Sequence, residues 1–302
     1  METQLGSKMK QPFYIQNEYA ALQKVILGTA QGIKPDPDRE LQRGLPATSQ
    51  LYTQPDPAVT GREFSAVLEV MEKLGIEVMQ PNLVESPKIT DQTCPRDIGF
   101  VIDSIYFRAN SRYTSRNLEH SGIEHLLGTF SSQHQIEMPK NIFLEGGDVV
   151  LAPWKVFIGL GARSTRTGIL WLADQLKHHG IDREIIIVPH DVLHLDCCWN
   201  VVGPNLALWC SQATCKFSDI NENSIEIDFE TILVNRKEQA ALATNVLVVG
   251  PGEILARNHF HCDKVNDQIE KKYKFLVHRL SFDCVHAIGG SFRCATLPLY
   301  RS

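Results

Sequence analysis

The sequence predicts an α/β fold built from repeated units, as in propeller-like architectures. Segments with helical spacing of apolar residues recur at intervals of about 50 residues. Paired short strands precede most of these helices, and a single strand follows each one. A doubly wound sheet is the alternative, because strands and helices alternate there too. The strand–strand–helix–strand order favours the repeat, since a Rossmann-type chain does not place hairpins before its helices.

The first unit starts with a buried strand, LysValIleLeuGly, at 24–28. Apolar residues at 64, 67, 68 and 71 share one helix face, and Gly75 ends that helix. The later units repeat this order. The paired strands are expected at 99–102 and 104–107, 148–151 and 155–158, and 245–248 and 253–256, the later helices at 117–127, 165–178 and 265–273, and the closing strands at 76–79, 136–138, 184–188 and 275–277.

Composition makes the chain an ordinary globular protein. Its 302 residues are 43% hydrophobic and 22% charged, which suffices for a large core. We expect one domain over residues 1–302, with residues 1–16 as a flexible N-terminal tail. The proline-rich segment 34–57 is expected to be a functional lid or an excursion, not a domain boundary.

Charge and cysteine content limit the expected partners and location. A net charge of −5 gives no electrostatic reason to expect nucleic acid or an anionic membrane as a partner. No run approaches the roughly 20 apolar residues that a membrane helix needs, and the N-terminus has no apolar stretch typical of a secretory signal. Eight cysteines without a CxxC pair indicate reduced thiols and a cytoplasmic location.

Three motifs resemble known sites but are better explained structurally. GlyLeuGlyAlaArgSer at 159–164 lacks the third glycine of a dinucleotide fingerprint, so we interpret it as a strand-to-helix turn. His190 and His194 have zincin spacing, but no helical pattern places them on one face. His259, His261 and Cys262 have no evident fourth ligand, so solvated or capping roles are expected.

Four short segments combine glycines with acidic, Cys or His side chains at strand ends. Each segment alone has a structural explanation, such as a turn carboxylate or a small buried Cys. Together they supply a thiol, an imidazole and several carboxylates. A thiolate nucleophile needs a base or cation that lowers its pKa, and two carboxylates can flank a planar guanidinium. We therefore expect cysteine chemistry on a cationic substrate. The segments are 94–99, 144–150, 194–199 and 289–299.

The chain resembles the guanidino-modifying superfamily, which includes arginine deiminases, amidinotransferases, dimethylarginine hydrolases and arginine dihydrolases. ArgAsp, GluGlyGlyAsp, HisLeuAsp and GlyGlySerPheArgCys stand in the family's order, and the resemblance extends from about Asn17 to the C-terminus. Segments 158–165 and 245–256 look most like arginine deiminases. The resemblance implies a single-domain, five-bladed α/β propeller (pentein) of ββαβ units around a central polar pocket. The four motifs lie at 96–97, 145–148, 194–196 and 289–294.

The resemblance also implies a role for each motif residue. Cys294 would attack the guanidinium carbon and form a Cys-bound amidino adduct. His194 would protonate the departing amine and later activate water. Glu145 would orient the imidazolium and hold one guanidinium nitrogen, and Asp97 and Asp196 would hold the others. No metal or organic cofactor enters this chemistry.

Two arginines are candidates for binding a substrate carboxylate. Arg163 matches the carboxylate-binding arginine of the deiminases, and Arg116, 19 residues after Asp97, matches a second one more loosely. A solvated surface charge is the alternative for either. The chain departs from the deiminases at His286, where no arginine precedes the nucleophile. It also has Arg293 where relatives commonly have His. The distal end of the substrate is therefore less defined than its guanidinium.

The expected activity is hydrolysis of arginine or a close analogue to citrulline and ammonia. Amidino transfer from arginine to an amine acceptor is the first alternative, and an arginine dihydrolase that gives ornithine is the second. A catalytically silent arginine-binding relative is the non-enzyme alternative. The chain order Glu, His, Cys disfavours a papain-like hydrolase. The expected partner is a small guanidino substrate, without nucleic acid or membrane, and a homo-oligomer is left open.

Overall fold

The computed structural model describes residues 12–34, 55–128 and 134–302. These residues form five three-stranded sheets, which confirms the predicted single-domain, five-bladed α/β propeller. Each middle strand pairs antiparallel with one neighbour and parallel with the other. The parallel pair requires a crossover, and in four of the five units a helix lies in this crossover.

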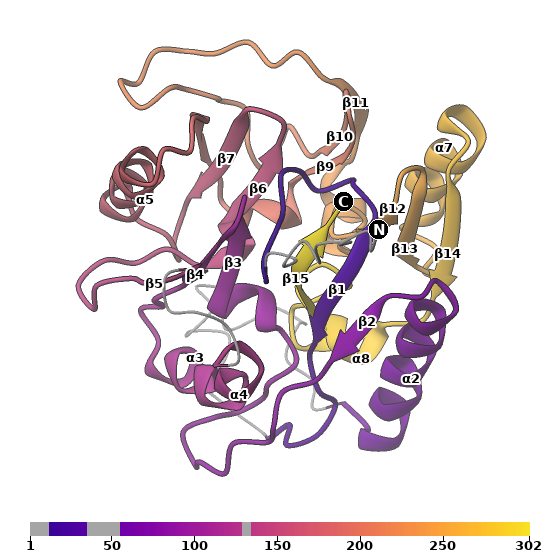
Figure 1. Ribbon diagram of the computed structural model, residues 1–302. Coiled ribbons are helices and arrows are strands. Elements are labelled where there is room, and N and C mark those ends of the chain that lie inside the picture. The colour runs from indigo at the N-terminus through magenta and orange to yellow at the C-terminus, as the bar shows by residue number, and fades with distance from the viewer. Residues whose placement is uncertain (1–11, 35–54, 129–133) are drawn as a thin grey trace, which may run out of the picture.

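The two ends of the chain build the first sheet together. Strand β1 (Leu22–Leu27) lies between the C-terminal strand β15 (Thr296–Arg301) and β2 (Glu77–Met79), and Figure 1 shows β1 and β15 side by side. Residues before β1 join this sheet, because the Tyr14 N–H donates to Leu299 O at 3.0 Å and Phe13 is fully buried. The expected flexible tail is therefore wrong for residues 12–16, and residues 1–11 lie outside the described part.

Each of the other four sheets is built from three strands that are consecutive in the sequence. Three of them match the predicted strand pairs and closing strands within a few residues. The sheets are β3 (Gly99–Ile102), β4 (Ile105–Arg108) and β5 (Gln135–Glu137); β6 (Val149–Ala152), β7 (Lys155–Leu160) and β8 (Glu184–Pro189); β9 (Trp199–Gly203), β10 (Leu206–Trp209) and β11 (Glu230–Leu233); and β12 (Leu247–Gly250), β13 (Glu253–Arg257) and β14 (Leu276–Leu280).

Helices fill four of the five crossovers. Asp56 caps α2, because its carboxylate accepts the Ala58 N–H at 2.8 Å, and Gly75 follows the helix with φ +72°. The helix expected at 117–127 is broken into shorter pieces by a 3₁₀ turn. The crossover helices are α2 (Pro57–Lys73), α3 (Thr114–Leu118) with η2 (Glu119–Gly122) and α4 (Glu124–Leu127), α5 (Arg166–His178) and α7 (Asp263–Tyr273).

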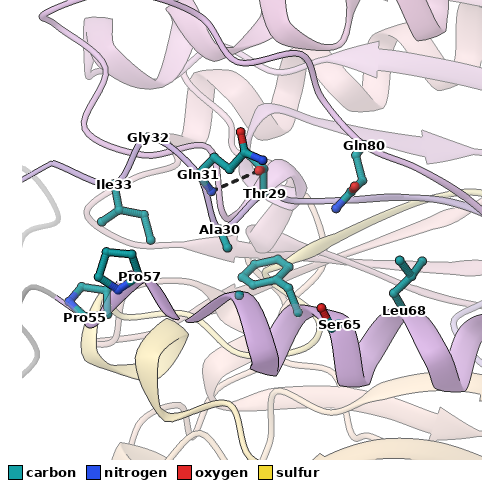
Figure 2. Close-up of a pocket in the computed structure, with 12 residues that line it drawn as sticks. Thr29, Ala30, Gln31, Gly32, Ile33, Pro55, Pro57, Ser65, Leu68 and Gln80 are labelled. Carbon is teal, nitrogen blue, oxygen red and sulfur yellow. Dashed lines mark hydrogen bonds between the residues drawn. The ribbon is translucent and has the colours of Figure 1, made fainter. Parts of the chain in front are cut away.

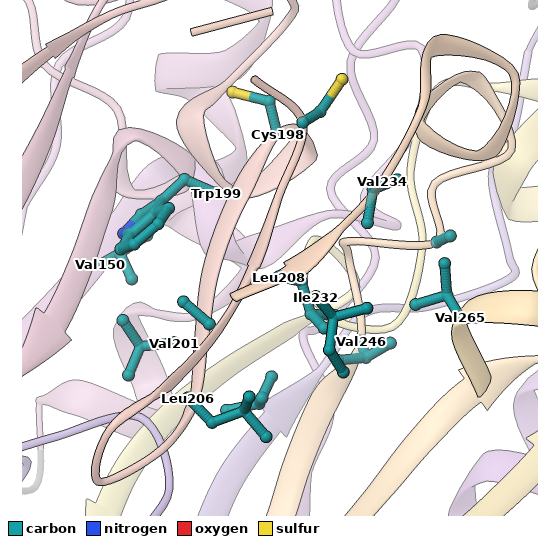
Figure 3. Close-up of a cluster of buried hydrophobic side chains, with 14 of the residues drawn as sticks. Val150, Cys198, Trp199, Val201, Leu206, Leu208, Ile232, Val234, Val246 and Val265 are labelled. Carbon is teal, nitrogen blue, oxygen red and sulfur yellow. The ribbon is translucent and has the colours of Figure 1, made fainter. Parts of the chain in front are cut away.

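The sheet β9–β10–β11 is the part that the sequence pattern missed. Its crossover at 210–229 contains no helix among the described residues, and no apolar residues recur there at helical spacing. Aromatic packing covers the sheet instead. The Trp199 ring lies 5.0 Å from Phe217 and 5.8 Å from Phe229, centroid to centroid. Figure 3 shows Trp199 within the largest buried cluster, beside Val150 and above Val201.

A short helical turn or helix precedes the first strand of each blade. In a five-fold repeat, these equivalent positions lie at one end of the molecule and face its centre. Four of these junctions carry the chemical motifs found in the sequence. The turns are η1 (Pro95–Ile98), η4 (Gly146–Asp148), η5 (Leu195–Cys197), α6 (Arg236–Ala240) and α8 (Asp283–Ala287). No helix in the described residues is long and apolar enough to cross a membrane.

Candidate active site

The junction segments are tied to one another by hydrogen bonds. The Arg96 N–H donates to Cys294 O at 3.3 Å, which joins η1 to the segment that ends in the predicted nucleophile. The Leu195 N–H donates to Asp148 Oδ1 at 2.8 Å, which joins η5 to η4. Segments that are far apart in sequence therefore meet in one buried polar centre.

Glycines allow these segments to approach closely. A Cβ on Gly146 would lie 2.1 Å from the Arg96 carbonyl oxygen. A Cβ on Gly147 would lie 2.7 Å from the ring of His194. Any side chain at either position would therefore displace a neighbour. This close approach is the physical reason for the GlyGly pair in the GluGlyGlyAsp motif.

His194 and Glu145 form the central ion pair. The imidazole Nε2 lies 2.8 Å from Glu145 Oε2, and both side chains are fully buried. Glu145 also accepts the Ser111 hydroxyl at 2.5 Å and Arg163 Nε at 3.2 Å. Burial alone would raise the pKa of Glu145, but Arg163 and His194 outweigh burial and lower it strongly. Glu145 is therefore an anion that holds the imidazole in place.

The carboxylates around His194 favour its protonated form. Burial alone would lower the pKa of His194, but Asp97 and the hydrogen bond to Glu145 outweigh burial and raise it to about 9. Asp97 Oδ1 lies 3.5 Å from His194 Nδ1. At neutral pH the side chain is an imidazolium, which can give a proton to a leaving group.

The environment of Cys294 keeps its thiol protonated. Ligand atoms of Asp196, Cys197 and Cys294 lie within 4.8 Å of one another. The hydrogen bond to Cys197, then burial, then the negative charge of Asp196 raise the pKa of Cys294 well above its ordinary value. Asp97 acts in the same direction, so this one carboxylate influences both His194 and Cys294. The charge of Arg293 interacts with Cys294, but it does not outweigh the effects that raise the pKa of the thiol.

Two carboxylate oxygens in this centre retain accepting capacity. Asp97 Oδ1 and Asp196 Oδ2 are buried and accept no hydrogen bond from the described residues. Asp196 Oδ2 lies 3.3 Å from Arg293 Nε, but without hydrogen-bond geometry. Burial raises the pKa of Asp196, although Arg293 and His194 oppose this effect. Acceptors of this kind suit a planar cation with several N–H donors.

The structure gives both candidate carboxylate-binding arginines partners within the protein. Arg163 is 2% exposed, is paired with Glu145, and lies 4.3 Å above the Tyr113 ring. Arg116 is 7% exposed and donates to Asp97 Oδ2 at 3.0 Å and Glu119 Oε1 at 2.5 Å. The alternative of a solvated surface charge is therefore wrong for both. Binding of a substrate carboxylate by either arginine stays a prediction.

Sequence reasoning missed two residues that position the site. Asn245 Oδ1 accepts the Cys294 N–H at 3.1 Å, and Asn245 is fully buried ahead of β12. Asp148 accepts His190 Nε2 at 2.9 Å besides the Leu195 N–H, so it holds the chain on both sides of His194. The signal for Asp148 was its place at the end of GluGlyGlyAsp. Nothing in the sequence marked Asn245 as a site residue, because it stands at the start of a segment that looks like an ordinary strand.

A third missed residue, Glu18, lies far from the motifs in sequence. Its carboxylate accepts two hydrogen bonds from Arg293, and Arg293 also donates to Val149 O at 2.8 Å. Burial would raise the pKa of Glu18, but Arg293 and Arg96 outweigh burial and lower it to about 2. Glu18 therefore fixes the arginine that stands directly before the nucleophile.

The potential metal ligands lie within this same centre. Among the described residues, two groups have ligand atoms within 4.8 Å of one another, Asp97 with Glu145 and His194, and Asp196 with Cys197 and Cys294. In the first group, Arg116, Arg163 and the imidazolium already compensate the carboxylates. In the second, raised thiol pKa values oppose the thiolate form that a soft metal requires. Cofactor-free chemistry stays a prediction.

The three motifs that resemble a dinucleotide or metal site have the structural roles predicted from the sequence. Thr165 caps α5 after the turn that follows β7, so segment 159–164 is the predicted strand-to-helix turn. No helix spans His190 to His194. Cys262 is the N-cap residue of α7, and the His261 N–H donates to His259 Nδ1 at 3.3 Å.

Comparison with known proteins places this site in a family. The sequence model of the family described as "N,N dimethylarginine dimethylhydrolase, eukaryotic" matches residues 40–301. The chain belongs to this family. It is thus an enzyme acting on guanidino groups, in the superfamily that the motifs indicated. Within that superfamily, segments 158–165 and 245–256 had favoured the deiminases, whereas the matching family is the dimethylarginine hydrolases.

Individual relatives agree over nearly the whole chain. YkgA of Bacillus subtilis, described as uncharacterized, is 28% identical over 291 residues and covers 94% of each chain. Inosamine-phosphate amidinotransferase from Streptomyces griseus shares the fold with a TM-score of 0.77 at 19% identity, over 97% of this chain and 98% of that one. A dimethylarginine dimethylaminohydrolase from Pseudomonas aeruginosa has a TM-score of 0.73 at 16% identity, over 92% and 99%.

Two cavities open near the junction segments. One has a volume of about 510 Å³, and Figure 2 shows it between Thr29–Ile33 and the face of α2 that carries Ser65 and Leu68. The predicted lid, 34–57, lies mostly outside the described residues, and of its described part Pro55 and Pro57 line this cavity. The other, of about 750 Å³, is lined by residues from η5, α6 and the α8 junction, Cys197 among them.

Proposed function

We propose that the protein hydrolyses the guanidinium group of arginine or a close analogue through a covalent amidino adduct on Cys294. The observation that supports this most is the junction of Cys294, His194 and three carboxylates in one buried centre. N-methylated arginines are close analogues that the family name favours. Asp97 and Asp196 are proposed to hold the guanidinium, because their buried oxygens have accepting capacity left.

Binding of the cation activates the nucleophile in this proposal. The thiol is neutral in the free enzyme because the hydrogen bond to Cys197, burial, and the charges of Asp196 and Asp97 together raise its pKa. A guanidinium between these carboxylates compensates their charge, so the same electrostatic effect reverses and the thiolate becomes accessible. The thiol loses its proton to solvent as the cation binds, because His194 already carries its own proton, and the thiolate then adds to the guanidinium carbon. Activation thereby depends on the charge and planarity of the substrate.

His194 is proposed to serve both halves of the reaction. As an imidazolium it gives its proton to the departing amine, and the Cys-bound amidino adduct remains. The neutral imidazole then takes a proton from water, which adds to the amidino carbon and displaces the Cys294 sulfur. With arginine the products are citrulline and ammonia. Glu145 keeps the ring oriented through both steps.

Arg163 and Arg116 are proposed to act through the carboxylates they contact. Arg163 keeps Glu145 ionised, and Arg116 keeps one oxygen of Asp97 occupied, so that the other faces His194. Capture of the substrate carboxylate by either arginine stays a prediction. A preference for arginine over agmatine, lost on Arg163→Ala, would support it.

Amidino transfer is the second candidate function. Two of the structural neighbours are described as amidinotransferases, with TM-scores of 0.75 and 0.77. Transfer requires only that an amine, rather than water, attack the amidino carbon of the adduct and release Cys294. A dihydrolase that gives ornithine and a silent arginine-binding protein are the remaining alternatives.

One experiment separates these functions. The protein is incubated with arginine, with and without glycine, and the products are identified by mass spectrometry. Citrulline and ammonia in both reactions support hydrolysis. Ornithine formed only with glycine, together with guanidinoacetate, indicates transfer. Ornithine and ammonia without glycine indicate a dihydrolase, and no product from arginine or its N-methylated forms contradicts an enzyme of this class.

A further inference from the structure

The short helix α8 leads into the segment that carries Cys294. The N–H of Gly289, just after the helix, donates to His286 O at 2.8 Å. The N–H of Gly290 donates to Val285 O at 3.0 Å, which completes a Schellman turn. Gly289 has φ +85°, the left-handed conformation that this turn requires and that glycine adopts easily. The position of α8 therefore sets where the chain enters the segment that ends in Cys294.

The end of this turn is packed against the nucleophile. A Cβ on Gly290 would lie 3.5 Å from Cys294 Cβ and 2.7 Å from Cys94 Sγ, so the backbone has no room for a side chain there. The backbone of Cys294 itself is held by Asn245, which accepts its N–H. A shift of α8 would therefore move the turn against a thiol whose own backbone is fixed.

Glu63 of α2 binds the start of α8. The first N–H groups of a helix have no partner within the helix, and Phe282, at the N-cap position, has no side-chain acceptor to offer them. The Asp283 N–H donates to Glu63 Oε1 at 2.8 Å, and the Cys284 N–H donates to Glu63 Oε2 at 3.0 Å. A carboxylate 220 residues before Asp283 thus has the role that a Ser or Asp N-cap has in other helices.

Aromatic packing joins the same segments. The Phe282 ring stacks on Phe292 with 4.5 Å between centroids and 5° between planes, and the Phe64 ring lies 5.3 Å from Phe282. All three side chains are buried. Phe64 follows Glu63 in α2, and Phe292 stands shortly before Cys294. This part of α2 therefore contacts the start of α8 through both a carboxylate and a ring.

The burial of Glu63 indicates that its carboxylate is used. Glu63 is 6% exposed, and burial raises its pKa, although the two N–H donors and the charge of Arg257 oppose this effect. An ionised carboxylate at such a site costs free energy unless polar groups compensate it. The N–H groups of α8 provide this compensation, so the carboxylate and the start of α8 depend on each other.

We propose that Glu63 is a positioning residue for the nucleophile, because it fixes the start of α8 and α8 fixes the turn that packs against Cys294. The inference rests on the proposed function, which makes Cys294 the nucleophile. Asp97 and Asp196, the carboxylates proposed to hold the guanidinium, belong to other junctions. Loss of Glu63 therefore affects the reaction step more than the binding of the guanidinium.

The first test measures the nucleophile segment without turnover. Hydrogen exchange of backbone amides, followed by mass spectrometry, compares wild type, Glu63→Ala and Glu69→Ala. Glu69 is exposed on α2, so its variant is the matched control for a shortened side chain in that helix. Glu63→Ala should speed exchange in 288–294 by about tenfold or more, and in 199–209, on another sheet, by less than about twofold. Glu69→Ala should change neither. Equal increases in both segments, or none, would overturn the inference.

The second test measures kcat and KM of the same three proteins with arginine or methylguanidine. Glu63→Ala should lower kcat by about tenfold or more and change KM by less than about twofold, since a small displacement of a reacting group slows the reaction. Glu69→Ala should leave both values unchanged. A purely structural role would leave kcat of the folded protein unaltered. A wild-type kcat in folded Glu63→Ala, or a change confined to KM, would therefore overturn the inference.

Glu63→Gln is a second variant with the same side-chain length. Its amide has one acceptor oxygen for two N–H donors, so it should lie between wild type and Glu63→Ala in both exchange and kcat. If Glu63→Ala does not fold, wild-type values for Glu63→Gln in both measurements would overturn the inference. Absence of turnover of every guanidine by wild type would overturn the proposed function, and hydrogen exchange would still decide whether Glu63 anchors the segment.

Discussion

The two sides of the catalytic centre differ in how their charges are compensated. On the His194 side, Glu145 receives Arg163, Ser111 and the imidazole, and its pKa is held low. On the Cys294 side, the thiol is protonated and an oxygen of Asp196 accepts no hydrogen bond from the described residues. The protein thus pairs Glu145 completely, whereas Arg293 lies 3.3 Å from Asp196 without a hydrogen bond and the thiol of Cys294 stays neutral.

This difference indicates what the substrate contributes. Arg163 and Arg116 belong to the protein and are buried against their carboxylate partners. They therefore keep the groups around His194 charged whether or not a substrate is bound. In the proposed mechanism the nucleophile depends on a cation that arrives with the substrate, so a reactive thiolate forms mainly when a substrate is bound. A buried neutral thiol is also a poor target for other electrophiles and oxidants.

Loss of the nucleophile gives the largest expected effect. Cys294→Ser should lower turnover of a guanidine substrate by more than about a thousandfold, since a hydroxyl without a strong base is a poor nucleophile. Steady-state assays with arginine or methylguanidine measure this, and Cys210→Ala, in a buried site on another sheet, should stay active. Cys197→Ala is not a neutral control, because its thiol contacts Cys294. Retention of a tenth of the wild-type rate by Cys294→Ser would contradict the assignment.

Changes on the His194 side should separate chemistry from binding. His194→Ala should slow both formation and breakdown of the adduct, by about a hundredfold or more. Asp97→Asn should mainly weaken substrate binding and positioning. Rapid-quench sampling with intact-protein mass spectrometry follows the adduct on Cys294. Unaltered affinity with ready adduct accumulation in Asp97→Asn would show that the two roles are not divided in this way.

Matched isosteric changes should affect stability in opposite ways on the two sides. Glu145→Gln leaves Arg163 without its buried counter-ion, so the free energy of unfolding should drop by about 3–5 kcal/mol. Asp196→Asn removes a carboxylate whose pKa the fold already raises, so stability should stay within about 1 kcal/mol while KM rises. Urea titrations of both variants measure this. Similar losses in the two variants would contradict the difference between the sides.

The pH dependence of stability should come from the His194 side. The folded pKa of about 9 lies above the ordinary 6.5, so protonated His194 stabilises the fold fully below pH 6.5. This contribution is lost as pH rises toward 9 and amounts to about 3 kcal/mol. Urea unfolding from pH 6 to 8, below the range in which buried thiols with raised pKa values add a decline of their own, should show the loss in wild type and much less of it in His194→Gln. A wild-type curve that is flat over this range would show that the imidazole is neutral.

The sequence predicted those parts of the molecule that local pattern encodes. Strand pairs and helix faces repeat along the chain, and GlyGly-containing segments mark close approaches, so the propeller and its four motifs were both predictable. The β9–β10–β11 sheet was missed because aromatic residues at 217 and 229 cover it in place of a helix. Such aromatic packing leaves no regular spacing of apolar residues in the sequence. Glu18 was missed because its partner, Arg293, is 275 residues away.

Charge compensation was the other part that could not be predicted. A carboxylate can bind a substrate cation or an arginine of the same chain, and both use the same residue types. The sequence marked Arg163 as a candidate for a substrate carboxylate, but it could not show that the fold also pairs Arg163 with Glu145. Only the three-dimensional arrangement shows which carboxylates are already compensated.

The most direct test of the account is a titration of the Cys294 thiol with and without a bound planar cation. Thiolate absorbance at 240 nm is followed from pH 6 to 11 as the difference between wild type and Cys294→Ser, with acetamidinium as the cation. The account predicts a midpoint above the ordinary thiol value in the free protein and a downward shift of at least about one unit when the cation is bound. A free thiol that ionises below pH 7, or a midpoint that saturating cation does not move, would contradict it.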